Sequence, residues 1–168
     1  KTVFTGLFAA MLQQQKRHVV TQKWVQTGYS EDDHDVLHHW RCMNKTKAAF
    51  EPHLNAILPY KFALPASAHL AAKEAAYEID PERIVGSLRY LEKIFDDVVV
   101  EGLGGCCVPL TTELTTLDLL ERLQLTCIVV VDPKLGSINH TLLTLQALSD
   151  RKVPVLGFVI NQRSQGVD

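Results

Sequence analysis

The sequence has 168 residues, 46% of them hydrophobic and 21% charged, and its formal net charge is -2. Its length and ordinary composition predict one globular domain. The near-neutral charge argues against a nucleic-acid partner, and no apolar run approaches the ~20 residues needed to cross a bilayer.

The first half of the chain mixes helical and extended signals. Apolar residues at helical spacing predict a helix over 3–12, which the polar run 13–17 ends. Residues 18–25 are a candidate short strand. After a polar loop, Asp33 or Asp35 is expected to cap the next helix. Residues 52–66 contain three prolines and are expected to form a long loop.

In the second half of the chain, predicted strands and helices alternate more regularly. Helices are expected over 67–78 and 81–95, followed by strands at 97–101, 126–131 and 153–160 with helices at 117–123 and 138–150 between them. Continuous β-branched runs are typical of strands covered on both faces. The pattern predicts an α/β fold with a doubly wound, mostly parallel sheet and helices on both faces.

Polar and glycine residues follow the predicted strands, where such folds bind ligands. These positions are 23–28, 101–105, 132–136 and Asn161. Glu101 is the strongest candidate, because an acid at the end of a buried strand is costly unless it is paired or bound to a metal. The glycines after it allow backbone to approach an anion closely, although a simple tight turn is the alternative.

Several other signals leave two interpretations open. Lys1-Thr2 before an apolar helix matches the end of a phosphate loop, or is an arbitrary start. Lys23 is either a functional cation at the carboxyl end of a strand or a surface lysine. The histidines near Asp35 suggest a metal site, but a polar, solvated helix face is favoured. That histidine group comprises His34, His38 and His39.

The four cysteines show no CxxC spacing, which indicates reduced thiols and a cytoplasmic protein. Adjacent Cys106 and Cys107 have no assignable His or Asp partner, so two small core residues are favoured over a nucleophile.

In order along the chain, the motifs resemble those of the dethiobiotin synthetase family. The matching segments are Lys1-Thr2, 23–28 (KWVQTG), 35–37 (DVL), 59–69 (PYKFALPASAH), 101–105 (EGLGG), 108–110 (VPL), 134–140 (KLGSINH) and 157–161 (GFVIN). The resemblance covers essentially the whole chain and implies a fold like that of phosphate-loop NTPases. The segments 59–62 and 135–140 are the most particular to the family.

The resemblance implies a reaction and a set of roles. Family members convert 7,8-diaminononanoate, CO₂ and MgATP into dethiobiotin, ADP and phosphate in biotin biosynthesis. Lys1 would hold the β and γ phosphates, and Lys23 would stabilise the carbamate and the transferring phosphoryl group. Thr27 would orient the carbamate, and Asn161 would recognise adenine.

The metal and the second substrate would have their own residues. Mg²⁺ would be bound by oxygens of Thr2, Asp35 and Glu101. The substrate carboxylate would be received across a homodimer interface, at a helix N-terminus. The residues implied there are Gly136, Ser137 and Asn139.

The chain also departs from the family pattern. Trp24, Leu103 and Ala68 replace a usual Pro, Ala and Pro without removing a role. The single domain 1–168 is expected to be truncated at both ends, without the first strand and the glycines of the phosphate loop, and as such to bind ATP poorly. Two other functions stay open: another phosphate-loop amidotransferase-type synthetase domain, and a non-catalytic paralogue.

Overall fold

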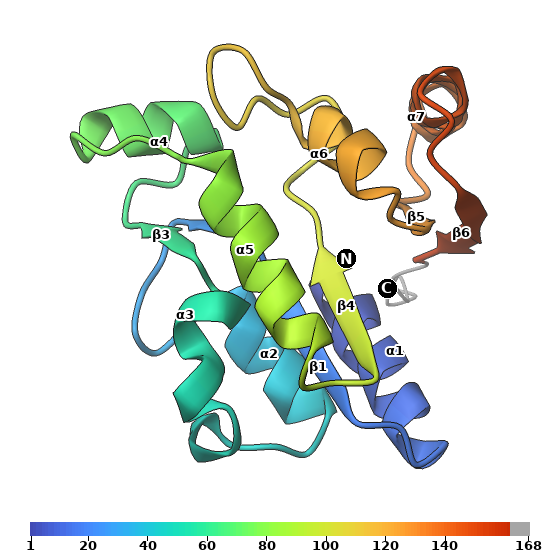
Figure 1. The fold of residues 1–168 in the computed structure, drawn as a ribbon. Helices are drawn as coiled ribbons and strands as arrows, with labels where there is room; N and C mark the ends of the chain where they lie inside the picture. The colour runs from blue at the N-terminus through green and yellow to red at the C-terminus, as the bar shows by residue number, and fades with distance from the viewer. Residues whose placement is uncertain (162–168) are drawn as a thin grey trace, which may run out of the picture.

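The computed structural model describes residues 1–161 as an α/β structure (Figure 1). Its elements, in chain order, are α1 (Thr2–Gln14), β1 (Val19–Lys23), β2 (Val25–Thr27), α2 (Asp35–Cys42), the 3₁₀ helices η1 (Lys47–Ala49) and η2 (Glu51–His53), α3 (Leu54–Ile57), β3 (Tyr60–Phe62), α4 (Ala68–Glu74), α5 (Pro81–Glu92), β4 (Asp97–Glu101), α6 (Thr116–Leu123), β5 (Cys127–Val131), α7 (Ser137–Asp150) and β6 (Val155–Ile160). The helices and strands predicted for the second half are confirmed within a few residues at each end.

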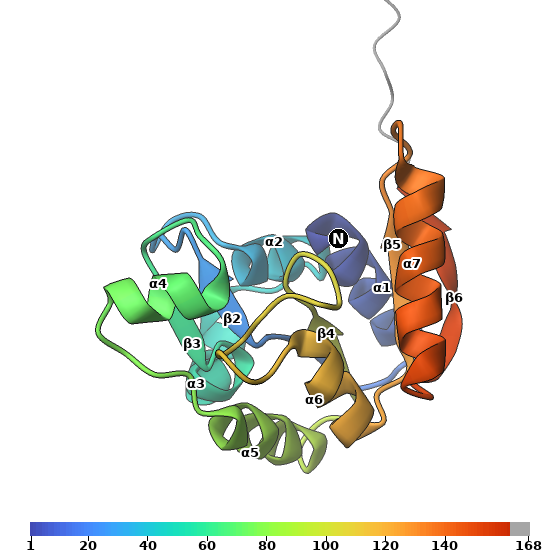
Figure 2. The ribbon, with the colours of Figure 1, turned by 90° about the horizontal axis from the view of Figure 1, so that it is seen from above.

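The centre of the molecule is the parallel pair β1–β4. Its register runs from Val19 opposite Asp97 to Lys23 opposite Glu101. Helices α1 and α2 cover one side of this pair, and α3 and α5 cover the other (Figure 2). Every residue of β1 is buried, the polar Thr21 and Gln22 included, because the strand lies between two helical layers.

Two apolar clusters hold these layers together. One surrounds β1 and joins α1, α2, α3 and α5, with Trp40 and Leu91 among its fully buried members. The other packs β2–β3 against α4, α5 and α6 around Trp24 and Leu88. The clusters lie beside the strands that end at Lys23 and Glu101, so they hold this end of the pair in place.

The strand expected over 18–25 is wrong in its length, because it is divided into two. The chain bends at the fully buried Trp24, after which β2 leaves β1 and pairs in parallel with β3. The long loop expected over 52–66 is also wrong. The proline-rich segment forms η2, α3 and β3, with Pro52 in the first turn of a helix, where a missing N–H costs little.

A side-chain cap begins helix α5, whereas helix α2 begins without one. Asp80 caps α5 by accepting a hydrogen bond from the Glu82 N–H at 2.8 Å, so the helix begins at residue 81, where the sequence predicted it. The Asp cap expected for α2 is wrong. The N-cap is His34, which makes no side-chain capping bond, and Asp35 is the first helical residue. Its carboxylate is therefore available for other contacts.

The pair β5–β6 is also parallel and carries α7 (Figure 2). Hydrogen bonds join the strands of residues 1–161 as three separate parallel pairs, β1–β4, β2–β3 and β5–β6. The α/β class is confirmed, while one continuous doubly wound sheet stays a prediction. Within the same residues, no helix combines the length and apolar character that crossing a membrane requires.

Candidate active site

Three charged side chains meet at the carboxyl end of the β1–β4 pair. Lys23 and Glu101 end the two strands and lie opposite each other in the register, so both project at the same edge. The Lys23 Nζ atom lies 3.1 Å from Glu101 Oε1 and 2.6 Å from Asp35 Oδ2. Only 6% of Lys23 and 3% of Glu101 are exposed. The lysine is therefore a buried cation between two carboxylates, which contradicts the alternative of a surface lysine.

The hydroxyl of Thr2 completes a group of oxygens at this edge. It lies 3.0 Å from Asp35 Oδ1 and 3.1 Å from Glu101 Oε1. One hydroxyl hydrogen can be donated to only one of these carboxylates at a time. The structure thus brings together the three residues that the sequence analysis assigned to Mg²⁺.

This donor set fits a small hard cation. Mg²⁺ prefers oxygen ligands, usually one or two carboxylates with water and phosphate oxygens. Asp35, Glu101 and Thr2 offer two carboxylates and a hydroxyl from three different elements. Among residues 1–161, no three His, Cys, Asp or Glu side chains lie close enough together to hold a metal ion by themselves.

Glu101 has a further partner that the sequence analysis missed. His39 Nε2 lies 2.7 Å from Glu101 Oε2, and the histidine side chain is fully buried. Burial by itself raises the pKa of Glu101, but the His39 hydrogen bond and the Lys23 charge outweigh it and lower the pKa to about 2. Glu101 is therefore an ionised carboxylate in the core.

The prediction of a solvated histidine face is wrong for two of the three histidines. His39 is 0% exposed and His34 is 8% exposed, whereas His38 is exposed and pairs with Asp33 at 2.8 Å. The spacing of Asp35 and His39 in the sequence could have predicted that the two residues lie together. His39 follows Asp35 by four residues, so both lie on one face of α2.

Lys1 lies at the other side of the group. Its ammonium donates to the Gly104 carbonyl oxygen at 2.6 Å, across the glycine segment that follows Glu101. Partial desolvation of the ammonium, and then the positive charge of Lys23, lower the pKa of Lys1. Gly104 adopts a φ of +40° and is one of the glycines that the sequence analysis associated with close backbone approach.

The remaining predicted residues lie outside this group. Thr27 ends β2, and the hydrogen bond recorded there joins its carbonyl oxygen to Gln26. The Asn161 N–H donates to Val131 at 2.8 Å, beyond the end of β6. Residues 136–139 form the start of α7, with Gly136 at a φ of +89°. Among residues 1–161, no side-chain hydrogen bond connects any of these positions to Glu101.

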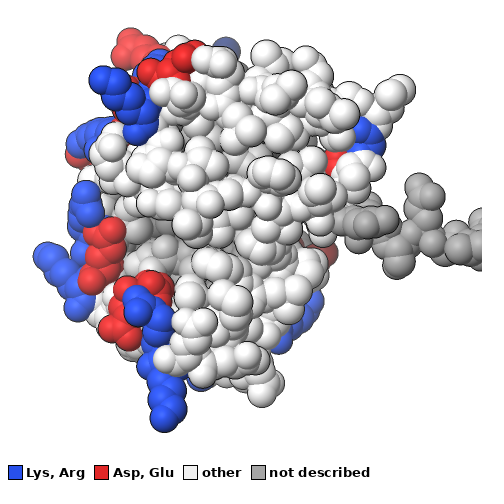
Figure 3. Space-filling view, turned by 90° about the vertical axis from the view of Figure 1, so that its right-hand side faces the viewer, with Lys and Arg blue, Asp and Glu red and all other residues white. Residues whose placement is uncertain are grey.

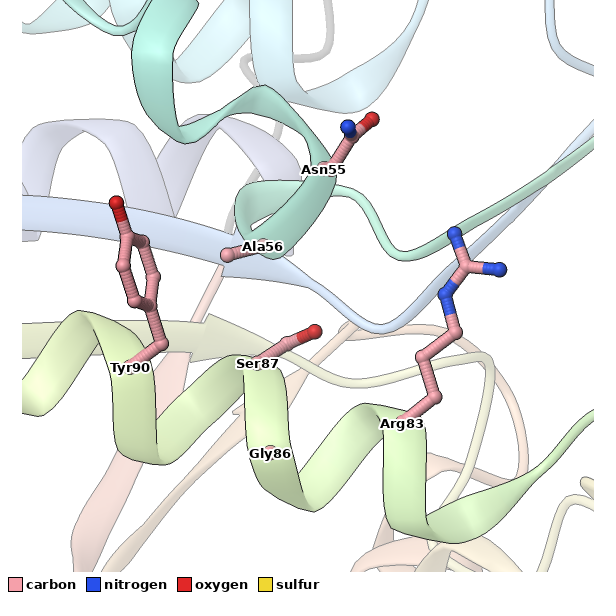
Figure 4. A pocket seen from close by; sticks show the side chains of 6 residues that line it. All are labelled: Asn55, Ala56, Arg83, Gly86, Ser87 and Tyr90. Atoms are coloured by element: carbon pink, nitrogen blue, oxygen red, sulfur yellow. The ribbon is translucent and has the colours of Figure 1, made fainter.

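A groove of about 450 Å³ leads away from the charged group. Its walls come from α1, β4 and β5, with Phe4 and Phe8 on the helix, and Lys1 and Glu101 among its lining residues. A separate, shallow hollow of about 450 Å³ lies between α3 and α5 (Figure 4). Its Arg83, Ser87 and Tyr90 come from α5, and it contains none of the charged group.

Comparisons with known proteins point to one family. A family model described as an AAA domain matches residues 1–166. The ATP-dependent dethiobiotin synthetase BioD 2 of Pasteurella multocida is 42% identical over 161 residues, covering 96% of this chain and 75% of that protein. The protein of the same name from Haemophilus influenzae is 40% identical, covering 96% and 84%. The ATP-dependent dethiobiotin synthetase BioD of Chlorobaculum tepidum is 40% identical, covering 96% and 67%.

Proposed function

The chain belongs to the dethiobiotin synthetase family, and from this we propose that it catalyses the ATP-dependent closure of a cyclic urea on 7,8-diaminononanoate with CO₂, releasing dethiobiotin, ADP and phosphate. The observation that carries the proposal is the buried Lys23 ammonium between Asp35 and Glu101, with the Thr2 hydroxyl beside them. Three charged groups gathered at one strand edge, two of them buried, are typical of a functional site.

The reaction has three steps. One amine attacks CO₂, forming a C–N bond and losing a proton to give a carbamate. A carbamate oxygen then attacks the γ-phosphorus while the bond to ADP breaks. The second amine attacks the activated carbonyl carbon, phosphate leaves, and the ring closes. Negative charge collects on carbamate and phosphoryl oxygens, so the protein must mainly neutralise charge and align the groups.

The chain's own cations suit this demand. Lys23 is held at 2.6 Å from Asp35 and 3.1 Å from Glu101, and it would stabilise the carbamate and the transferring phosphoryl group. Lys1, held on Gly104, would contact the β and γ phosphates. Thr2, Asp35 and Glu101 would hold Mg²⁺, which neutralises phosphate charge when it is bound. The low local dielectric strengthens each of these interactions.

We extend the proposal to the two ends of the substrates and to a homodimer. Asn161 would recognise the adenine edge, and Thr27 would orient the carbamate. The N-terminus of α7, with Gly136, Ser137 and Asn139, would receive the substrate carboxylate from a partner protomer, because helix N-termini attract anions. The same proposal includes a single synthetase domain and a cytoplasmic location.

The surface around α7 supports a dimer. Leu135, Ile138, Leu142 and Leu143 are all more than 60% exposed. The face of the molecule in Figure 3 has few charged side chains over its centre. Exposed apolar patches of this kind mark interaction surfaces. Sedimentation of the full-length protein should give a dimer at micromolar concentration, and Ile138→Asp should shift it to monomer. A monomeric parent would contradict this part of the proposal.

Product analysis tests the main proposal directly. The full-length protein with 7,8-diaminononanoate, bicarbonate and MgATP should release ADP and dethiobiotin in equal amounts, measured by mass spectrometry. Omitting the diamine should abolish ADP release. A protein that binds ATP tightly but forms no dethiobiotin would be the non-catalytic paralogue, and the proposal would be wrong.

A further inference from the structure

The two carboxylate oxygens of Glu101 have different partners. Oε1 faces the Lys23 ammonium and the Thr2 hydroxyl, each at 3.1 Å. Oε2 lies 2.7 Å from His39 Nε2, whereas the contacts with Thr2 and Lys23 are made by Oε1. Only Oε1 is therefore turned toward the place where a cation would sit.

The histidine that contacts Oε2 is held firmly. Its side chain is fully buried, and its Cα lies against α1 at Gly6, where an added Cβ would meet His39 Cα at 3.0 Å and Cys42 Cβ at 2.8 Å. Helices α1 and α2 thus approach each other too closely for His39 to move back from the carboxylate. A side chain locked by packing is what precise positioning of a ligand requires.

The hydrogen bonding of His39 is directed at Glu101 alone within residues 1–161. Its Nδ1 atom is buried and has no hydrogen-bond partner among them. A carboxylate accepts hydrogen bonds only, so Nε2 must carry the proton that is shared with Oε2. Burying an imidazole with one nitrogen unpaired costs stability, and the contact with Glu101 is what the protein gains from it.

We propose that His39 is a positioning residue that keeps Glu101 a one-oxygen ligand and so favours Mg²⁺ over larger cations such as Ca²⁺. The proposal rests on the Mg²⁺ site of the proposed function. Mg²⁺ requires near-ideal octahedral geometry with oxygens at about 2.0–2.1 Å, whereas Ca²⁺ accepts bidentate carboxylates at about 2.3–2.6 Å. A carboxylate whose second oxygen is occupied by His39 suits the first ion and not the second.

Replacing the histidine should release the second oxygen. In His39→Leu, Glu101 is free to turn and offer both oxygens, so Mg²⁺ should bind about 10-fold or more weakly, while Ca²⁺ should lose less affinity or gain some. The ratio of Mg²⁺ to Ca²⁺ affinity should fall about 10-fold. His39→Gln keeps a side-chain amide donor near the position of Nε2 and should stay within about threefold of the parent ratio.

The measurement is titration calorimetry of each ion into the full-length protein saturated with ADP, so it does not depend on turnover. His38→Leu is the matched control, because His38 is the exposed neighbour on the same helix and should leave the ratio unchanged. Circular dichroism and thermal unfolding establish that each variant is folded. If His39→Leu is not folded, His39→Met, which also lacks a hydrogen-bond donor, takes its place with the same expected fall in the ratio.

Three results would overturn the inference. They are an unchanged Mg²⁺ to Ca²⁺ ratio in the folded donor-free variant of His39, a fall in the ratio as large in His38→Leu, and a fall in the ratio as large in His39→Gln, which keeps a donor. Dethiobiotin synthesis by the parent protein is measured in parallel. If the parent makes dethiobiotin and the ratio does not move, the positioning role fails while the proposed function stands. If the parent makes none, the proposed function fails on its own assay.

Discussion

Two of the parallel strand pairs have different surroundings. In β1–β4, every residue of β1 is buried and helices lie on both sides. In β5–β6, the strand β6 leaves Leu156 71% exposed and Phe158 60% exposed. The strands β4, β5 and β6 were predicted from runs of β-branched and other apolar residues, and the first strand from its valines. The run therefore identifies a strand, while the helices packed around it determine its burial.

The difference matters for chemistry. Lys23 and Glu101 lie at the end of the covered pair, and both are nearly inaccessible to water. Coulomb interactions are several times stronger at such a site than at the surface. Asp132 and Asn161 follow the ends of β5 and β6, and the Asp132 carboxylate pairs with exposed Lys134. The covered pair is thus where transition-state charge can be stabilised most strongly.

The largest effect should come from the covered pair. Lys23→Ala should lower kcat by ~10²-fold or more, because it removes one strong electrostatic donor from a desolvated site. The Kd for nucleotide should change far less. Lys23→Arg should restore little of the kcat, since the planar guanidinium group of arginine cannot replace a compact ammonium group. Steady-state kinetics of the full-length protein would measure this.

The control is Lys93→Ala, because Lys93 is exposed at the end of α5. If the kcat of Lys23→Ala were within about threefold of the kcat of Lys93→Ala, the mechanism would be contradicted.

The next largest effect should be on stability, where truncating a leucine beside each strand pair should distinguish the two pairs. Leu91 on α5 is fully buried against the covered pair, so Leu91→Ala should reduce the free energy of unfolding by about 2–5 kcal/mol. Leu156 on β6 is 71% exposed, so Leu156→Ala should change it by about 0.5 kcal/mol or less. Urea denaturation of both variants gives the comparison. Equal losses would mean that β6 is covered in solution.

The cap of α6, which lies between the pairs in the chain, should have a smaller effect. Thr115 and Asp118 form a reciprocal capping box, with Thr115 Oγ1 accepting from the Asp118 N–H at 3.3 Å. Thr115→Ala should cost about 1 kcal/mol of folding stability. Thr111→Ala is a matched comparison, because the half-buried Thr111 accepts a hydrogen bond from the Leu114 N–H in a turn and not at a helix N-cap. Thermal unfolding that is unchanged in Thr115→Ala would contradict the capping role.

The smallest effect should be a pH dependence at the same cap. Hydrogen bonds from Thr115, and then Arg151, lower the pKa of Asp118 below its usual value near 3.8. A lowered folded-state pKa stabilises the protein above the unfolded pKa, and this contribution is lost as the pH falls through the folded pKa. The parent should therefore exceed Asp118→Asn in stability at pH 6, and the difference should shrink below about pH 4. A constant difference between pH 6 and pH 3 would contradict the assignment.

Much of the local structure could be predicted from residues near one another in sequence. The helix from Ser137, the strand ending at Glu101 and the Asp80 cap of α5 follow from periodicity and capping. The errors arose where a distant partner decided the outcome. Val25 left the first strand because Tyr60 was available to pair with it, and residues 60–62 became a strand for the same reason.

The sequence by itself determined the α/β class, the acid and lysine at strand ends, and the family resemblance. The tertiary structure alone decided that the Lys23 ammonium lies between Asp35 and Glu101, and that His39 contacts Glu101. Glu101 lies 62 residues from His39, 78 from Lys23 and 99 from Thr2. Periodicity and propensity act over one or two turns of chain. Contacts across such separations depend on strand register and helix packing, which short-range patterns do not encode.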